Sequence, residues 1–374
     1  MCYTTFVVPG KMILTRNQKG LYMSKVIVGM SGGVDSAVAA YLLKQEGHEV
    51  IGVTLRTWQS KDGKESRCCE IDDARRVAWK LGIKYYPFNC IAEFEKNVTK
   101  PFVNDYICGR TPNPCTRCNR YVKWDKMLYV AKVMQADYIA TGHYAEVVKL
   151  DNGRFSFKQA LHAKKDQTYM LYSLTQDQIR ATLMPLGKLT KDEVRKIALE
   201  AGLPVAEKPD SQEICFVSEG TNYTDYIAEY SDAPMPGAGN FDDEEGNVLG
   251  VHKGIIHYTV GQRKGLGIAL GYPAYVNAIR ADRNEVVIGS EDSLFSDEII
   301  CGDINLMSIP ELTGKLHCNV KVRYHHPGQG AYIERMDDNH IKVHFDSPVR
   351  AAAPGQAAVF YDENDCVIGG GVIC

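Results

Sequence analysis

Residues 29–36 read Gly-Met-Ser-Gly-Gly-Val-Asp-Ser and stand between an apolar run at 26–28 and a helical pattern. Small residues let successive backbone N–H groups turn toward one anion, and the helix that follows presents its unpaired amides to the same point. The string therefore predicts a phosphate-binding turn between a strand and a helix. Ser31 and Ser36 would add hydroxyl donors, and the Asp35 carboxylate could hold a metal ion that bridges phosphates.

Two familiar nucleotide-binding motifs are excluded. No Gly-Lys-Ser or Gly-Lys-Thr occurs in the chain, so the string is not a P-loop with its phosphate-gripping lysine. Gly265 and Gly267 begin a dinucleotide fingerprint, but its third glycine comes one place late, at Gly271. The alternative to a phosphate-binding turn is an ordinary strand-to-helix turn without a ligand. That alternative does not explain why the specific string at 31–36 is present.

Between residue 25 and about residue 144, apolar runs typical of buried strands alternate with helical patterns. The strand-like runs cover 25–30, 50–55, 83–88 and 138–141, and the helical patterns cover 35–46, 71–81 and 121–134. This alternation predicts an α/β fold with a Rossmann-like, doubly wound parallel sheet. The active site of such a sheet lies where strand ends meet helix starts, which is where the phosphate string, Gly142 and Cys118 are expected.

The composition changes after about Val217. Prolines and glycines at 234–239 and the acidic run 242–245 predict a linker or exposed loop. Strand pairs follow, with 274–279 against 285–288 and 331–334 against 341–345. We expect a disordered extension at 1–23, a catalytic domain at 24–217, a small central domain at 218–292 and a C-terminal β-barrel at 293–374. An organelle transit peptide is the alternative for the extension.

Twelve cysteines without framework spacing, in a chain this long, indicate a reducing compartment and hence a cytoplasmic protein. No segment has the length and apolarity of a membrane span. Cys118 lies between Arg117 and Arg120, near the expected start of the third helix, and both factors favour a thiolate. Cys215 closes a polar loop after a helical pattern at 191–201, a position that suits an accessible sulfur.

The Cys-x-x-Cys at 115 and 118 also admits a metal site. Cys68 and Cys69, or His143, would complete a structural zinc site, and Cys215 would be the third thiolate of an iron–sulfur cluster. Adjacent cysteines are poor zinc ligands and no second Cys-x-x-Cys occurs, so we expect no zinc. An iron–sulfur cluster held by Cys115, Cys118 and Cys215 remains an alternative.

Six motifs occur in order along the chain: GMSGGVDS at 29–36, GRTPNPCTRCN at 109–119, TGHYA at 141–145, KKDQTYML at 164–171, DSQEICF at 210–216 and YTVGQRKGLG at 258–267. Together they resemble the tRNA-specific 2-thiouridylase family (MnmA type) of the PP-loop ATP pyrophosphatase superfamily. The resemblance implies an ATP-dependent sulfurtransferase that adenylates the C2 oxygen of the wobble uridine of tRNA and replaces it with sulfur, releasing AMP and pyrophosphate.

The resemblance also implies roles for individual residues. The expected ATP contacts are Gly29, Met30, Ser31, Gly32, Gly33, Val34, Asp35, Ser36, Leu55 and Gly142, the sulfur-handling pair is Cys118 and Cys215, and the expected tRNA contacts are Asn113, Pro114, Cys115, Lys165, Asp166, Gln167, Arg323 and Tyr324. Cys215 would carry a persulfide. Cys118 would free its terminal sulfur or close a disulfide with Cys215. Mg²⁺ and a sulfur-donor protein, such as a cysteine desulfurase or a sulfur relay protein, are implied partners.

The commonest family pattern has aspartate where this chain has Cys115. The third thiol leaves two routes open, in which sulfur arrives on a Cys215 persulfide or through an iron–sulfur cluster. The net charge of −3 and the pI of about 6.4 predict no bulk attraction for RNA. Residues 110–132, however, hold six basic side chains against one acid, which predicts a local RNA-binding face.

Two other functions share some of these features. Another PP-loop enzyme, such as an amide-forming ligase, would use the phosphate string but would have no use for Cys118 and Cys215. A non-catalytic RNA-binding or metal-binding module would bind RNA without releasing AMP, and it would leave the phosphate string unexplained.

Overall fold

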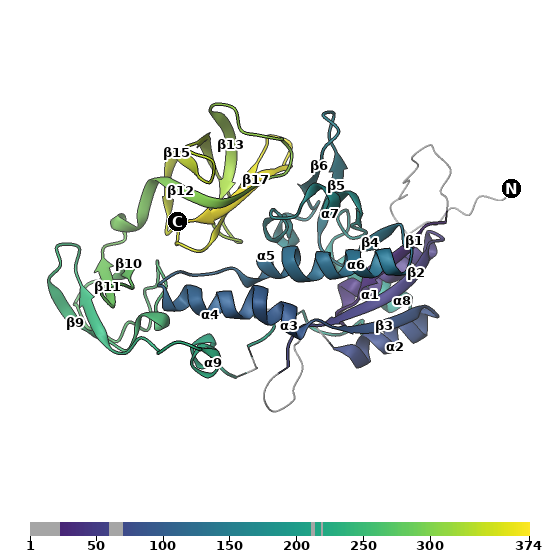
Figure 1. Cartoon of the computed structure of the whole chain (residues 1–374), viewed down its shortest axis with the longest axis horizontal. Coiled ribbons are helices and arrows are strands. Elements are labelled where there is room, and N and C mark those ends of the chain that lie inside the picture. The colour runs from purple at the N-terminus through teal and green to yellow at the C-terminus, as the bar shows by residue number, and fades with distance from the viewer. Residues whose placement is uncertain (1–22, 60–69, 211–213, 218–219) are drawn as a thin grey trace.

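The computed structural model describes residues 23–59, 70–210, 214–217 and 220–374, so all but residue 23 of the expected extension at 1–23 lies outside the described residues. The first region is built on a parallel sheet with the order β3-β2-β1-β4-β7 (Figure 1). Its strands are β1 (Lys25–Gly29), β2 (Glu49–Arg56), β3 (Lys84–Asn89), β4 (Tyr138–Ala140) and β7 (Thr182–Leu183). The order reverses between β1 and β4, so the doubly wound prediction is confirmed.

Helices cover both faces of this sheet, as the side chains of β1 show. Val26 and Val28 are buried with α1 (Val34–Gln45), α2 (Ile71–Leu81) and α8 (Lys191–Glu200). Ile27 points to the opposite face, into a cluster formed with the helices between residues 91 and 133. Since successive strand residues face opposite sides, a continuous apolar run is what a sheet covered on both faces requires.

The helical segment that carries Cys118 begins earlier than the sequence predicts. It runs without interruption through α5 (Pro114–Cys118), a π-helical stretch (Asn119–Trp124) and α6 (Asp125–Val133). The expected start near residue 121 was wrong because Pro114 stands at the first helical position, where its missing N–H is not needed. The side chain of Asn113 caps the helix by accepting the Cys115 N–H at 3.1 Å. Cys118 therefore lies inside the second turn rather than before the helix.

Other helices of this region had no counterpart in the sequence prediction. They are α3 (Ile91–Phe94), a π-helical stretch (Glu95–Thr99), α4 (Lys100–Ile107) and α7 (Gln176–Arg180). A hairpin of β5 (Ala145–Lys149) and β6 (Phe155–Gln159) follows β4. This hairpin contacts the C-terminal barrel, because Ser156 Oγ donates to the Val367 carbonyl at 2.6 Å.

The central part contains α9 (Tyr223–Tyr230) and a sheet with the order β10-β11-β8-β9. Its strands are β8 (Gly239–Asp242), β9 (Val248–His252), β10 (Tyr275–Arg280) and β11 (Glu285–Gly289). The prediction of a linker or exposed loop at 242–245 was wrong only for Asp242, which is buried in β8; Glu244 and Glu245 are exposed in the β8–β9 turn. Asp243 accepts the backbone N–H of Asn247 at 2.7 Å, which is the turn chemistry of these residue types.

The C-terminal part is a closed antiparallel barrel with the order β12-β15-β14-β13-β16-β17, so the barrel prediction is confirmed. Its strands are β12 (Phe295–Leu306), β13 (Leu316–Lys321), β14 (Gln329–Arg335), β15 (Ile341–Arg350), β16 (Ala357–Tyr361) and β17 (Val367–Ile373). Among the described residues, no helix combines the length and apolarity that crossing a bilayer requires.

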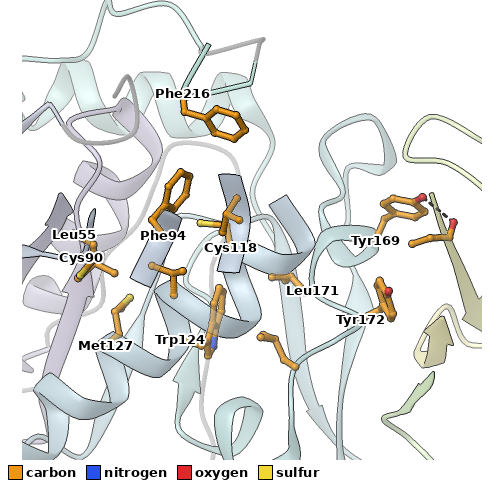
Figure 2. Close-up of a cluster of buried hydrophobic side chains, with 14 of the residues drawn as sticks. Leu55, Cys90, Phe94, Cys118, Trp124, Met127, Tyr169, Leu171, Tyr172 and Phe216 are labelled. Atoms are coloured by element: carbon orange, nitrogen blue, oxygen red, sulfur yellow. Dashed lines mark hydrogen bonds between the residues drawn. The ribbon is translucent and has the colours of Figure 1, made fainter. Parts of the chain in front are cut away.

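One hydrophobic cluster joins the sheet, the Cys118 helix and the barrel. It includes Leu55 of β2, Trp124 of the π-helical stretch and Tyr361 of β16. At the barrel boundary, the Tyr169 hydroxyl donates to the Ala357 carbonyl at 2.8 Å (Figure 2). The relative positions of the domains therefore depend on the same packing that holds the helix.

Trp124 is fully buried, and its indole N–H donates to Thr182 Oγ1 at 2.8 Å. We expect Trp124→Ala to lower the free energy of unfolding by about 3–5 kcal/mol, because it opens a large cavity in this cluster. The matched control is Trp79→Ala, since Trp79 is 86% exposed and its loss should change stability by no more than about 0.5 kcal/mol. Urea midpoints followed by circular dichroism test the pair, and equal midpoints would contradict the expectation.

Candidate functional site

The phosphate string forms a tight loop between β1 and α1. Its two serines are turned inward, with the Ser31 N–H donating to Ser36 Oγ at 3.2 Å and Ser36 Oγ donating to the Gly33 carbonyl at 3.1 Å. Gly33 is the N-cap of α1, and within the described chain no side chain caps this end. The first amides of α1 and the positive end of its dipole therefore remain available to an anion.

Two glycines of the site have no room for a side chain. Gly32 has a φ of +81°, and an added Cβ would lie 2.7 Å from the Glu70 carbonyl oxygen. At Gly142, which follows β4, an added Cβ would lie 2.6 Å from the Ser36 nitrogen. The two loops thus touch at the point where the strand order reverses, the position at which ligands bind in open α/β sheets.

Asp35 holds two partners in the first turn of α1. The hydroxyl of Tyr144 donates to Asp35 Oδ1 at 2.8 Å, and Lys191 Nζ lies 2.7 Å from the same oxygen. Burial and the neighbouring Asp35 raise the pKa of Tyr144, so this hydroxyl stays a donor. Lys191 is only 9% exposed and comes from the first turn of α8. Lys191 thus places a cation beside the phosphate string, as the lysine of a P-loop motif would have done.

Lys191 was missed by the sequence analysis because it is more than 150 residues from Asp35 along the chain. One feature of the sequence could have pointed to Lys191. A lysine at the first position of a helix faces the positive end of the helix dipole, which is unfavourable unless a negatively charged partner compensates it. Here the compensation comes from two carboxylates, Asp35 and Asp210, each 2.7 Å from Nζ.

Asp210 connects this cation to the segment that leads to Cys215. It also pairs with Lys165 at 2.9 Å and with Arg195 at 3.2 Å. Partial burial opposes ionisation, but hydrogen bonds from Lys191 and Lys165 outweigh it and lower the pKa of Asp210. The Asp210 carboxylate therefore stays ionised at neutral pH, and through Lys191 it ties the start of the Cys215 segment to the phosphate loop.

Lys208 makes a second tie between the same segments. It pairs with Glu70 and Asp73 near the start of α2, and its Nζ lies 3.4 Å from the Gly32 carbonyl oxygen. Hydrogen bonds to both carboxylates raise the pKa of Lys208 despite partial burial. The phosphate loop is thus held on one side by Lys191 and on the other by Lys208.

The expected tRNA contacts at 165–167 form part of this framework. Asp166 is 5% exposed and accepts hydrogen bonds from the Ala160 N–H at 3.0 Å and the Thr168 hydroxyl at 2.7 Å. Burial raises the pKa of Asp166 above its ordinary value in spite of these bonds. Gln167 Oε1 accepts the Tyr144 N–H at 3.0 Å. Both side chains organise the loop, and their contact with tRNA stays a prediction.

The segments carrying Cys118 and Cys215 meet at one hydrophobic cluster. Cys118 is 6% exposed and buried in it, while Cys215 is half-buried and packs against it. The ring of Phe216 lies 5.6 Å from that of Phe94, and Figure 2 shows both rings beside Cys118. Leu55, the expected adenine contact, is buried in the same cluster. The structure therefore brings both thiols to one hydrophobic cluster, and their roles stay a prediction.

The remaining expected tRNA contacts come from α5 and from the barrel. Cys115 is exposed, and Tyr324 packs half-buried with its ring 6.1 Å from that of Tyr169. Burial raises the pKa of Tyr324, and the charges of Asp166 and Cys115 raise it further. Arg323, the preceding residue, is exposed. Asn113 and Pro114 form the capped start of the helix, and the role of these residues toward tRNA stays a prediction.

Across the described parts of the chain, no group of three or more His, Cys, Asp or Glu side chains is arranged to hold a metal ion. Cys68 and Cys69 lie outside the described residues. His143, the other zinc candidate, bonds to Thr141 Oγ1 through Nδ1 at 2.8 Å, and its ring packs 5.6 Å from that of Trp124. Desolvation, with a smaller effect from Lys123, lowers the pKa of His143 to about 3, so the ring is neutral.

A doubly wound sheet with a phosphate loop at its switch point, joined to a C-terminal barrel, defines a PP-loop type of nucleotide-dependent enzyme. Three family models match the chain: a "tRNA methyl transferase HUP domain" at 24–219, a "tRNA methyl transferase PRC-barrel domain" at 224–290 and an "Aminomethyltransferase beta-barrel domain" at 296–373.

Curated relatives match almost the whole chain. The tRNA-specific 2-thiouridylase MnmA of Lachnoclostridium phytofermentans is 54% identical over 358 residues, covering 94% of this chain and 99% of that protein. The corresponding protein of Clostridium perfringens is 50% identical, covering 93% of this chain and 98% of that protein. The chain therefore belongs to the tRNA-specific 2-thiouridylase family.

The solved structures that the chain resembles are less similar in sequence than these relatives. The U34-tRNA thiolase NcsA from Methanococcus maripaludis, a structure that includes a [4Fe-4S] cluster, shows 21% identity and a TM-score of 0.35, and the match covers 56% of this chain and 64% of that chain. A likeness at this level carries no argument about this site.

Gly142→Ala tests the contact between the two loops. Because its Cβ would overlap the first turn of α1, we expect the phosphate loop to shift and ATP affinity to fall by about 10-fold or more, or 1.4 kcal/mol. Gly237→Ala is the control, since an added Cβ there meets nothing within 4 Å. Isothermal titration calorimetry with ATP measures both, and equal affinities would exclude the proposed loop contact.

His143 predicts a pH dependence of stability. Its pKa is about 3 in the folded protein against 6.5 when unperturbed, so below pH 6.5 the unfolded chain binds a proton that the folded chain excludes. Stability should fall with pH from 6.5 toward 3, by at most about 1.4 kcal/mol per pH unit from this residue. We expect His143→Gln to reduce that slope in thermal melts between pH 7 and 5. An unchanged slope would refute the assignment.

Proposed function

We propose that this chain is an ATP-dependent tRNA 2-thiouridylase that replaces the C2 oxygen of the wobble uridine with sulfur. The observation that supports the proposal is that Lys191 ties Asp35 of the uncapped phosphate loop to Asp210, which precedes Cys215, while Cys215 and Cys118 share one hydrophobic cluster. The relatives are named as thiouridylases, whereas two of the domain models are named for methyl transfer. The site fits thiouridylation better, because methyl transfer has no evident need for a phosphate loop together with two thiols.

The first step would use the phosphate loop. The C2 oxygen of uridine attacks the α-phosphorus of ATP, the bond to the β-phosphate oxygen breaks, and pyrophosphate leaves. The α1 amides and the Lys191 ammonium would stabilise the charge that develops on the phosphates. The glycines at 32 and 142 leave the close backbone approach that such a ligand needs. The Asp35 carboxylate fits Mg²⁺, which prefers carboxylate and phosphate oxygens and would neutralise phosphate charge there.

The second step would use the two thiols. The terminal sulfur of a Cys215 persulfide reaches C2, either directly or after release as hydrosulfide, and AMP leaves with the former C2 oxygen. In either order the Cys118 thiolate attacks Cys215 Sγ, so the protein ends with a Cys118–Cys215 disulfide that an external thiol must reduce. A sulfur-donor protein would then reload Cys215. This chemistry belongs in the cytoplasm, where cysteines are kept reduced.

The cysteine roles predict a separation of the two steps. Cys215→Ser and Cys118→Ser should lose 2-thiouridine formation while keeping tRNA-dependent pyrophosphate release within about twofold, since neither thiol contacts the phosphate loop in this scheme. Cys374→Ser, at an exposed thiol on the barrel, is the control.

Thionucleoside analysis and pyrophosphate assays on the same tRNA give the readouts, and non-reducing peptide mass spectrometry after one turnover should find the 118–215 disulfide. Undiminished 2-thiouridine in Cys215→Ser would reject the persulfide route.

For Lys191 we expect the first step, pyrophosphate release, to be impaired. Lys191→Met should slow pyrophosphate release by about 10²-fold, because it removes a preorganised cation from the place where phosphate charge develops. The control is Lys188→Met, whose side chain is 71% exposed and pairs with Glu146 at 3.6 Å. Single-turnover assays at saturating ATP separate chemistry from binding. A normal rate in Lys191→Met would remove this residue from the proposed mechanism.

A further inference from the structure

A second concave site lies on the opposite side of the Cys118 helix, where the helix faces the barrel. It is a cleft of about 240 Å³ lined by Asn113, Arg117, Arg120 and Tyr121 from the helical segment and by Asp303 and Val372 from the barrel, with Tyr172 at its wall. In Figure 1, α5 lies beside the barrel, and the Thr111 N–H donates to the Pro354 carbonyl at 2.7 Å across this boundary. The cleft is therefore a fixed feature of the domain interface.

The two arginines carry charge that the described protein does not neutralise. Their guanidinium carbons lie 5.4 and 5.1 Å from the centre of the Tyr121 ring. Arg117 Nε donates to the Asn97 carbonyl at 2.8 Å, but throughout the described ranges neither Arg117 nor Arg120 forms an ion pair with a carboxylate. Both side chains are half-buried, where an unneutralised cation is costly unless a ligand supplies the partner.

The acids of the cleft do not cancel this charge. Asp105 is already paired with Arg110, whose Nε donates to it at 2.8 Å. Asp303, which has a φ of +47°, is the remaining carboxylate. Two arginines against one aspartate leave the cleft net positive, although the chain as a whole has a net charge of −3.

Tyr172 adds a hydroxyl donor to the wall of the cleft. The residue is 3% exposed, and in the part of the chain that the structure describes its hydroxyl makes no hydrogen bond to another protein group. Burial and Asp303 raise the pKa of Tyr172, while Arg120 opposes this, so the hydroxyl stays protonated at neutral pH. It can therefore donate to an oxygen of a ligand in the cleft.

We propose that this cleft binds a phosphodiester group of the tRNA substrate, held by the guanidiniums of Arg117 and Arg120 and by the Tyr172 hydroxyl. Guanidinium donors match phosphate oxygens in geometry and charge. Asn113, an expected contact of the target base, lines the same cleft, so the phosphate would belong to a nucleotide near the modified uridine. The inference rests on the proposed function, because the RNA is the substrate of that reaction.

The test compares tRNA binding by variants of equal net charge. The double variant Arg117→Gln/Arg120→Gln should weaken binding of a substrate tRNA transcript by about 10-fold at 0.1 M KCl. It should also reduce the slope of log Kd against log salt by about 0.7–0.9, the loss of one phosphate contact. The control double variant, Arg75→Gln/Arg335→Gln, removes two charges at surface sites away from the cleft and should change neither quantity. Tyr172→Phe should weaken binding without changing the slope.

Fluorescence anisotropy between 50 and 200 mM KCl gives the affinities, and circular dichroism confirms that each variant is folded. Equal affinity and slope in the cleft and control variants would overturn the proposal. So would a cleft variant that loses affinity only for inorganic phosphate in calorimetry. Failure of the wild-type protein to form 2-thiouridine would overturn the proposed activity instead, and the binding comparison would still decide the role of the cleft.

Discussion

The arrangement of this protein depends on one hydrophobic cluster that extends from the parallel sheet, through the helix that begins at Pro114, to strands β16 and β17 of the barrel. Burial of apolar surface is the main force that fixes these elements together, and here the same side chains serve two domains. Because Cys118 lies inside the cluster and Cys215 packs against it, the positions of both thiols follow from core packing rather than from surface loops. The barrel therefore helps to position both thiols.

Around this core the charged groups form two functional faces. On the sheet edge, Asp35 and Asp210 share Lys191, which links the phosphate loop to the segment that precedes Cys215. On the barrel side of the helix, Arg117 and Arg120 face a cleft that the acids of the described protein leave net positive. A weakly acidic chain can thus present one local cationic surface to RNA, while the nucleotide site behind it is organised by internal ion pairs.

Much of the fold could be predicted from the sequence, because its strongest patterns are local. Apolar runs and helical periodicity located the four main strands of the sheet, and strand pairs located the barrel. The helix start near residue 121 was wrong, since Pro114 reads as a helix breaker until its position at the first helical residue is known. The site was predictable only where residues are neighbours in sequence. Lys191 and Lys208 reach the phosphate loop, and Tyr172 reaches the cleft, from distant segments, and only the folded chain shows these positions.

The contact at Gly142 has a consequence for the energetics of ATP binding. The glycine rests directly on the first turn of α1, and contacts of Lys191 and Lys208 within the protein hold the loop from either side. The conformational entropy of this loop is therefore lost when the chain folds, not when the nucleotide arrives. Such preorganisation leaves more of the interaction free energy to appear as affinity, and it makes the binding site as stable as the sheet that supports it.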